Sequence, residues 1–120
     1  MNWVLDKKRP VCPQICEQIC VFIASGSLLP DQRLPSVREV ALQAGVNPNT
    51  VQRSLETLEE QGILYSVRGS GWYAAEDTAG AKEMLEHLIA EKTAAFFAEM
   101  RALGLSETQI KQYVKEYDHE

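Results

Sequence analysis

Residues 34–75 read LPSVREVALQAGVNPNTVQRSLETLEEQGILYSVRGSGWYAA. Ser36 and Glu39 have the spacing of a capping box, in which each side chain satisfies a backbone amide at a helix start. Gly45 is typical of a helix end. The stretch therefore begins with a short predicted helix that ends in a glycine turn.

A second helix and a hairpin follow. Asn47 is a typical N-cap, Pro48 suits the first helical position, and Gly62 is a natural stop. Residues 63–74 are rich in β-formers and contain the turn sequence RGSG, which predicts a β-hairpin. Two short helices followed by a hairpin are the parts of a winged helix–turn–helix.

Helical patterns flank this stretch on both sides. Apolar residues recur at helical spacing over residues 13–25, and a longer helical pattern covers residues 79–103. A second capping box, at residues 106–109, predicts a short last helix. The side chains of that helix expected to face inward are Ile110, Tyr113, Val114 and Tyr117.

The order of these elements gives the fold class: mostly α, with a small β-hairpin wing. We expect a winged helix–turn–helix DNA-binding domain in residues 1–75, followed by two helices forming a dimerisation region in residues 76–120. Residues 1–75 hold seven Lys or Arg and seven Asp or Glu, so the net charge of −5 falls entirely in residues 76–120. The acidic total therefore does not exclude a local basic patch that binds DNA.

Composition limits the class of protein. With 120 residues, of which 45% are apolar and 24% charged, the chain can form one small domain and an appendage. No run approaches the roughly 20 apolar residues of a membrane span, and the start, MNWVLDKKRP, has no secretory signal. Three cysteines, an odd number, argue against a closed disulfide framework. We expect a cytoplasmic protein without a membrane partner.

The start of the second motif helix carries side chains suited to duplex DNA. The major groove admits one helix, whose N-terminal residues reach base edges. Asn49 and Gln52 can each pair with adenine, whereas Asn47 and Thr50 suit phosphate or sugar, and Arg53 suits a phosphate. Two of these assignments have alternatives: Asn47 as an N-cap only, and Arg53 as a solvated charge.

Two further elements offer contacts to DNA. Arg38, in the first turn of the preceding helix, can reach a guanine or the backbone. The predicted hairpin tip consists of Arg68, Gly69, Ser70 and Gly71. This tip suits the minor groove, with Arg68 inserted and the glycines allowing close approach. As a nucleotide-binding loop, GSG lacks the Lys-Ser/Thr that such loops require, so a hairpin turn is the better interpretation.

Residues 26–75 resemble the DNA-binding domain of the GntR family of bacterial transcriptional regulators. The resemblance is carried by LPSVRE, GVNPNTV, the LExxG segment and RGSGW, and it extends through RPVCPQICEQI to cover residues 9–75. It implies a homodimeric repressor that binds a two-fold-symmetric double-stranded DNA operator. The sequence leaves open whether a small-molecule effector exists. The short tail, with its ALGLSETQI connection, is similar to the C-terminal dimerisation region of the YtrA-like subgroup.

The resemblance also assigns DNA contacts. Those of the family fall on Ser36, Arg38, Asn47, Asn49, Thr50 and Gln52, and on the wing from Arg68 to Gly71. Many relatives have Arg or another polar residue at the position of Pro48, which cannot donate a hydrogen bond. Many also have Arg where Gln52 stands, so an adenine-compatible contact is expected in place of a guanine contact.

The long helix carries an apolar stripe that needs a cover. Its expected dimerisation residues are Leu85, Leu88, Ile89, Phe96, Met100 and Leu103. A lone surface helix cannot bury such a stripe, and a two-fold operator requires a two-fold protein, which favours a partner subunit. Deletion of residues 78–120 is accordingly expected to leave a folded monomer with weak operator affinity.

Other classes of function have less support in the sequence. No Ser–His–Asp set, paired carboxylate cleft or Cys–His nucleophile is apparent, so neither an enzyme nor a cofactor is expected. Glu83, His87 and Glu91 share a helix face that can bind a metal, but a charged solvent face explains them better, and no metal is expected. The alternative to DNA binding is a protein-interaction or ligand-sensing module of the same fold.

Cys12, Cys16 and Cys20 lie four residues apart in the first predicted helix. With Ile15 at 0° and about 100° per residue, they lie at about 60°, 100° and 140°. A zinc site needs more ligands than they supply, and a disulfide within one helix is strained. We therefore expect Cys12 and Cys16 to fill the core and Cys20 to be exposed and reactive.

Overall fold

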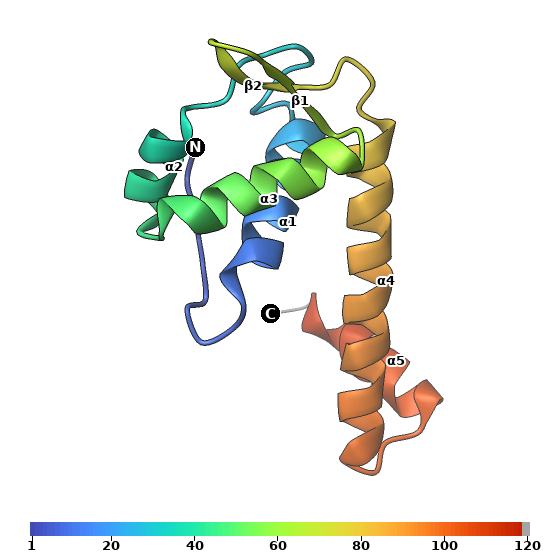
Figure 1. The fold of residues 1–120 in the computed structure, drawn as a ribbon. Helices are drawn as coiled ribbons and strands as arrows, with labels where there is room; N and C mark the ends of the chain where they lie inside the picture. Colours follow the sequence, from blue (N-terminus) through green and yellow to red (C-terminus); the bar gives the residue numbers. More distant parts are fainter. Residues whose placement is uncertain (119–120) are drawn as a thin grey trace. The chain divides into compact units, whose positions relative to one another are not determined.

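A computed structural model describes residues 1–118 and contains the predicted elements in the predicted order (Figure 1). They are α1 (Val11–Ser25), α2 (Val37–Ala44), α3 (Pro48–Glu60), β1 (Leu64–Val67), β2 (Gly71–Ala74), α4 (Ala79–Ala102) and α5 (Glu107–Tyr117). The predicted fold class, a winged helix–turn–helix followed by two helices, is confirmed. The chain divides into two compact units, the first at Met1–Leu85 and the second from Glu86 onward.

The core of the first unit lies between its helices. Ile15 and Ile19 of α1 are fully buried, as are Val51, Leu55 and Leu58 of α3. Figure 1 shows α3 crossing α1, with α2 beside the start of α3. Burial of each such side chain contributes about 1.5–3 kcal/mol, so the inward face of α3 is fixed by packing and its outward face is left free.

A capping box begins α2, as predicted. The Ser36 Oγ atom accepts a hydrogen bond from the Glu39 backbone N–H at 3.1 Å, and Glu39 Oε1 accepts one from the Ser36 N–H at 3.1 Å. The bond from the Ser36 backbone lowers the pKa of the Glu39 carboxyl below its usual value. The same type of box, between Ser106 and Gln109, begins α5.

The capping box predicts a dependence of stability on pH. Because the pKa of Glu39 is lower in the folded chain than in the unfolded chain, its stabilising effect is present above the usual value of 4.5 and is lost as the pH falls through the folded pKa. We expect the melting temperature to fall more steeply on acidification in the native chain than in the Glu39→Gln variant, since Gln accepts the same bond at every pH. Circular dichroism melts at stepped pH measure both; parallel losses contradict the prediction.

The hairpin is antiparallel, with Leu64 opposite Ala74 and Val67 opposite Gly71. The connector before α2 also contributes: Arg33 forms an isolated bridge to Tyr73, and the Leu34 N–H donates to the Trp72 carbonyl at 2.8 Å. The sequence predicted an irregular connector there. The added bonds tie the base of the wing to the residues that precede the capping box.

The first turns of α4 belong to the core of the first unit. Ala81 is 1% exposed, and a Cβ built at Gly80 lies 3.2 Å from the Ile63 side chain. The Met84 sulfur lies 3.2 Å from the Cys20 Sγ atom. A truncation that preserves this core must therefore retain the start of α4, which a deletion beginning at residue 78 removes.

The expectation of an exposed Cys20 is wrong. Cys20 is fully buried and Cys16 is 6% exposed, whereas Cys12 is only partly buried. The helical wheel places Cys20 at the edge of the apolar face of α1, but Met84 covers that edge. Burial raises the pKa of both Cys16 and Cys20 to about 12.

These environments predict the order of thiol reactivity. A thiol reagent acts on the thiolate, which burial disfavours at Cys16 and Cys20. We expect a maleimide to modify Cys12 of the native protein first, and all three thiols only after unfolding. Peptide mass spectrometry after a timed reaction gives the order; early modification of Cys20 in the native chain contradicts it, and the Cys12→Ser variant serves as the control.

The second unit is small and leaves apolar side chains uncovered. Ile110 of α5 is fully buried, as predicted. Tyr113, Val114 and Tyr117 are 57%, 50% and 78% exposed, so the expectation that they face inward is wrong within this chain. In the second unit α5 packs against α4 alone, and one neighbouring helix covers only one side of α5.

Among the described residues, none of the helices is both long and apolar enough to span a membrane.

Candidate nucleic-acid interface

The start of α3 is a capped helix end with free polar side chains. The Asn47 Oδ1 atom accepts a hydrogen bond from the Asn49 backbone N–H at 2.8 Å, so Asn47 is the N-cap. Its side-chain NH₂ group has no partner among residues 1–118. Thr50, one turn later, is half-buried. Asn47 therefore fills its structural role and retains a donor that faces solvent.

Asn49, Gln52 and Arg53 lie on one exposed face of α3. At about 100° per residue they fall within roughly 100° of one another, opposite the buried Val51 and Leu55. In the described part of the chain, no hydrogen bond occupies these three side chains. The arrangement presents two amides and one guanidinium from the first turn and a half of the helix.

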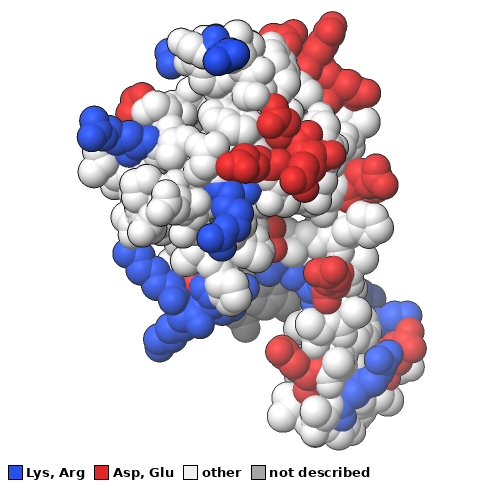
Figure 2. Space-filling view, viewed as in Figure 1, with Lys and Arg blue, Asp and Glu red and all other residues white. Residues whose placement is uncertain are grey.

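Acidic side chains limit this face at the other end of α3. Glu56, Glu59 and Glu60 are exposed, and Figure 2 shows Asp and Glu gathered over the C-terminal half of the helix. Lys and Arg lie instead over the hairpin tip, α2 and the N-terminal segment. A polyanion is therefore repelled from the C-terminal end of α3, while the N-terminal end carries the partial positive charge of its amides.

The two predicted DNA contacts at the start of α2, Ser36 and Arg38, differ in whether their side chains are already engaged in the structure. The Ser36 Oγ atom is engaged as the cap of the helix, although its hydroxyl hydrogen can still donate. Arg38 is exposed, and its side chain makes no ion pair within residues 1–118. Arg38 is thus an exposed cation, without an ion-pair partner among the described residues, in the first turn of α2.

Aromatic side chains stabilise the hairpin that forms the wing. Tyr65 and Tyr73 stack with ring centroids 5.4 Å apart, and the Tyr65 hydroxyl donates to Asp31 Oδ1 at 2.9 Å. The Ser70 and Tyr73 hydroxyls also share a hydrogen bond. Arg68 and Gly69 remain exposed at the tip, so the wing presents a cation at the end of a hairpin that these contacts stabilise.

Arg33 is a candidate residue that sequence reasoning missed. It lies in the predicted connector, yet its Nε atom is 3.3 Å from the point where a Cβ at Gly71 would lie. Gly71 has a φ of +134°, which few side chains tolerate. Arg33 therefore adds a second guanidinium at the wing, and only the pairing of residues distant in sequence reveals it.

Five of the six predicted dimerisation residues lie in α4, and Leu103 directly follows its last residue, Ala102. At about 100° per residue the five form one stripe, within roughly 120° of one another. Leu85, Leu88 and Met100 are partly buried, whereas Ile89, Phe96 and Leu103 are 62%, 40% and 77% exposed. In the second unit a groove of about 650 Å³ adjoins this stripe. Its lining consists of Phe96, Tyr113, Val114, Glu116 and Tyr117.

The described residues contain no group of three or more His, Cys, Asp or Glu side chains placed to hold a metal ion. Glu83, His87 and Glu91 are all exposed along α4 and form no such group.

Comparison with known sequences places this geometry in a family. The family model described as "Bacterial regulatory proteins, gntR family" matches residues 13–74. The chain is 37% identical to the uncharacterized HTH-type transcriptional regulator YhcF of Bacillus subtilis, over 98% of this chain and 97% of that protein. It is 32% identical to the HTH-type transcriptional repressor YtrA of the same organism, over 89% of this chain and 83% of YtrA.

Solved structures agree. A GntR family transcriptional regulator from Listeria monocytogenes has a TM-score of 0.80 and 36% identity, covering 93% of this chain and 98% of that one. YtrA from Sulfolobus acidocaldarius, a GntR-family transcription factor, has a TM-score of 0.59 and 31% identity, covering 78% and 99%. AraR(DBD) in complex with operator ORE1 has a TM-score of 0.54 and 35% identity, covering 62% and 94%. The chain belongs to the GntR family of bacterial transcriptional regulators, with YtrA-type proteins among its relatives.

Proposed function

We propose that this chain is a homodimeric transcriptional repressor that binds a palindromic DNA operator. The observation that carries the proposal is the start of α3, where uncommitted amide side chains surround a capped helix end and acidic residues follow. Such an end fits the major groove, where amides read base edges. Relatives named as repressors, and the AraR domain in complex with its operator, support the same role here.

The proposed contacts divide by the chemistry of each side chain. Asn49 and Gln52 read bases, with adenine as the base that their amides fit best. Arg38 binds a guanine or the backbone, and the wing binds the minor groove through Arg68 to Gly71. The proposed sugar and phosphate contacts are Ser36, Asn47, Thr50 and Arg53.

Dimerisation through residues 76–120 is the second part of the proposal. The groove lined by Phe96 and Tyr113 is apolar and has no cover in the described chain. Large exposed apolar patches mark interaction sites, and a second copy of this chain brings an equally apolar face. The two copies of α3 then enter successive major grooves about 34–36 Å apart. A ligand that regulates such a dimer would act by changing the separation of the two heads, which shifts the population between binding-competent and incompetent dimers. The proposed location is the cytoplasm.

Selection of genomic fragments with the purified protein, followed by sequencing, tests the proposal. We expect enrichment of a sequence with two-fold symmetry, bound with an affinity that falls steeply with salt as condensed counterions are released. Enrichment of asymmetric sites contradicts the dimeric arrangement. A protein that binds no duplex at low salt contradicts DNA binding and favours an interaction module of the same fold.

A further inference from the structure

We propose that the basic loop Asp6–Arg9 is a second DNA-contacting element, which binds phosphates beside the groove that the start of α3 enters. The inference rests on the proposed DNA binding and extends the interface beyond the residues that the motif assigns. The ligand is the phosphate backbone of duplex DNA, independent of its sequence.

The loop reaches the turn between the two motif helices. The Lys7 Nζ atom lies 3.2 Å from the point that a Cβ at Gly45 would occupy. Gly45 is the C-cap of α2 and precedes Asn47, the N-cap of α3, by two residues, a chain distance of at most about 7 Å. The Lys7 ammonium group is therefore next to the end of α3 that faces DNA under the proposed function.

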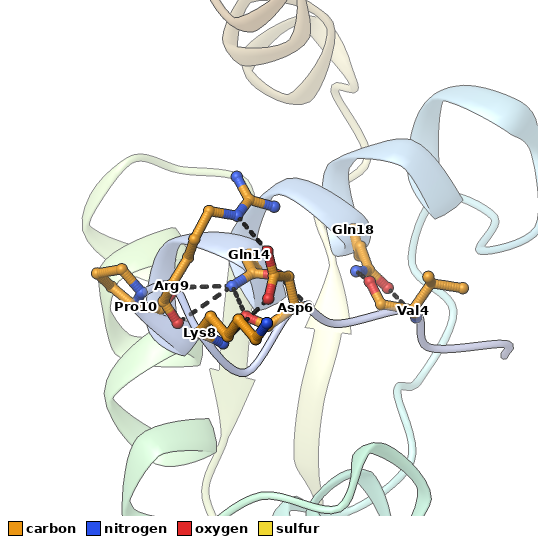
Figure 3. A network of polar contacts seen from close by, with 7 residues as sticks. All are labelled: Val4, Asp6, Lys8, Arg9, Pro10, Gln14 and Gln18. Carbon is orange, nitrogen blue, oxygen red and sulfur yellow. Dashed lines mark hydrogen bonds and ion pairs between the residues drawn. The ribbon is translucent and has the colours of Figure 1, made fainter.

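A buried glutamine gives the loop its shape (Figure 3). Gln14 of α1 is 5% exposed, and its Oε1 atom accepts a hydrogen bond from the Asp6 N–H at 2.8 Å. Its Nε2 atom donates to the carbonyls of Asp6, at 2.8 Å, and Pro10, at 3.0 Å. The Gln14 side chain thus fixes the backbone at both ends of the loop. Because the loop is already ordered, binding a phosphate costs less conformational entropy.

Residues before the loop are also tied to the helices. Gln18 Oε1 accepts a hydrogen bond from the Val4 N–H at 2.9 Å, and Figure 3 shows this pair beside the loop. The Trp3 indole N–H donates to Gln43 of α2 at 3.1 Å, and its ring meets Phe22 edge-on at 5.1 Å. Residues 3–4 therefore pack against α1 and α2, and these contacts fix the position of the loop that follows.

The charges of the loop are available to a ligand. Lys7 and Lys8 are exposed and make no ion pair within residues 1–118. Arg9 pairs with Asp6 at 3.2 Å, but these side chains are 59% and 49% exposed, so the pair is weak and its guanidinium stays within reach of solvent. The loop Asp6–Arg9 therefore presents three cations and one carboxylate, in the N-terminal segment over which Figure 2 shows Lys and Arg.

The test is the Lys7→Ala/Lys8→Ala variant, titrated against a mixed-sequence duplex of about 30 base pairs at several salt concentrations. We expect the slope of log K against log salt to decrease in magnitude by about two per bound protomer, and affinity at about 0.1 M salt to fall roughly ten- to sixty-fold. Lys82→Ala/Lys115→Ala is the matched control, because it removes two exposed lysines elsewhere and changes the net charge equally.

Gln14 is tested as a positioning residue by Gln14→Leu, which keeps every charge. We expect Gln14→Leu to weaken DNA binding when Lys7 and Lys8 are present, and to have a much smaller effect in the Lys7→Ala/Lys8→Ala background, where only Arg9 of the loop remains. A general folding defect weakens binding equally in both backgrounds. Two outcomes overturn this inference and leave the proposed function standing, provided that the native chain binds DNA. In the first, the salt slope of the Lys7→Ala/Lys8→Ala variant equals that of the native chain. In the second, the Lys82→Ala/Lys115→Ala control loses as much affinity as the Lys7→Ala/Lys8→Ala variant. A native chain that binds no duplex overturns both.

Discussion

Alanine at both Asn49 and Gln52 is expected to abolish the preference of this protein for its operator while leaving its binding to unrelated duplexes nearly unchanged. Each amide that pairs with the correct base contributes about 1–3 kcal/mol of discrimination, so the pair contributes about 2–6 kcal/mol per protomer. That loss corresponds to roughly 30-fold to 10⁴-fold in the ratio of specific to non-specific affinity.

The position of the two side chains explains why the effect is confined to specificity. Both are exposed and neutral, and neither has a hydrogen-bond partner among residues 1–118, so their removal changes neither the core nor the charge. We expect the free energy of unfolding to stay within about 0.5 kcal/mol of the native value. The cations that bind phosphates remain, and they supply the non-specific affinity.

Fluorescence anisotropy with the selected operator and with a scrambled duplex, at one fixed salt concentration, measures the ratio. Gln61→Ala is the matched control, because it removes another exposed side-chain amide, just beyond the end of α3. If the double variant retains the ratio of specific to non-specific affinity, base recognition belongs to Arg38 or to the wing instead. A variant that loses both affinities equally makes Asn49 and Gln52 backbone contacts instead.

Elements that depend on neighbouring residues were predictable from the sequence. The boxes at Ser36 and Ser106 and the Asn47 cap form through hydrogen bonds within three residues. The hairpin follows from turn residues between two runs of β-formers. In each case interactions between residues close in sequence fix the backbone, so the local sequence pattern is enough to predict the structure.

Features that depend on distant residues were not predictable. Cys20 is buried because Met84, 64 residues later, covers it. Arg33 reaches the wing because it bridges to Tyr73, and the basic loop has its shape because Gln14 binds it from α1. A helical wheel identifies which side chains share a face, but it does not identify what will cover that face.

Glutamate at Phe96 is expected to convert the protein to a folded monomer with a large loss of operator affinity. Phe96 lines the apolar groove of the second unit and is 40% exposed, so a carboxylate there is solvated in the monomer but unpaired when a second copy covers the groove. Burial of an unpaired charge costs several kcal/mol, which exceeds what a small interface can compensate.

The loss of affinity follows from the geometry of a two-fold operator. In a dimer, binding of the first α3 places the second near its half-site at an effective concentration in the millimolar range, which raises the affinity by about 10²–10⁴-fold over one head. Phe96→Glu removes this factor while Asn49 and Gln52 of each monomer remain intact. A duplex with one half-site should therefore bind the variant and the native chain with similar affinity per head.

Sedimentation velocity and operator titration, performed on the same preparation, decide the matter. Thr108→Glu is the matched control, because it adds one carboxylate to the exposed first turn of α5 outside the groove. A Phe96→Glu protein that still sediments as a dimer excludes this groove as the interface. A monomer that binds the full operator as tightly as the native chain excludes dimerisation as the source of affinity, because the second head then contributes nothing that the first does not already supply.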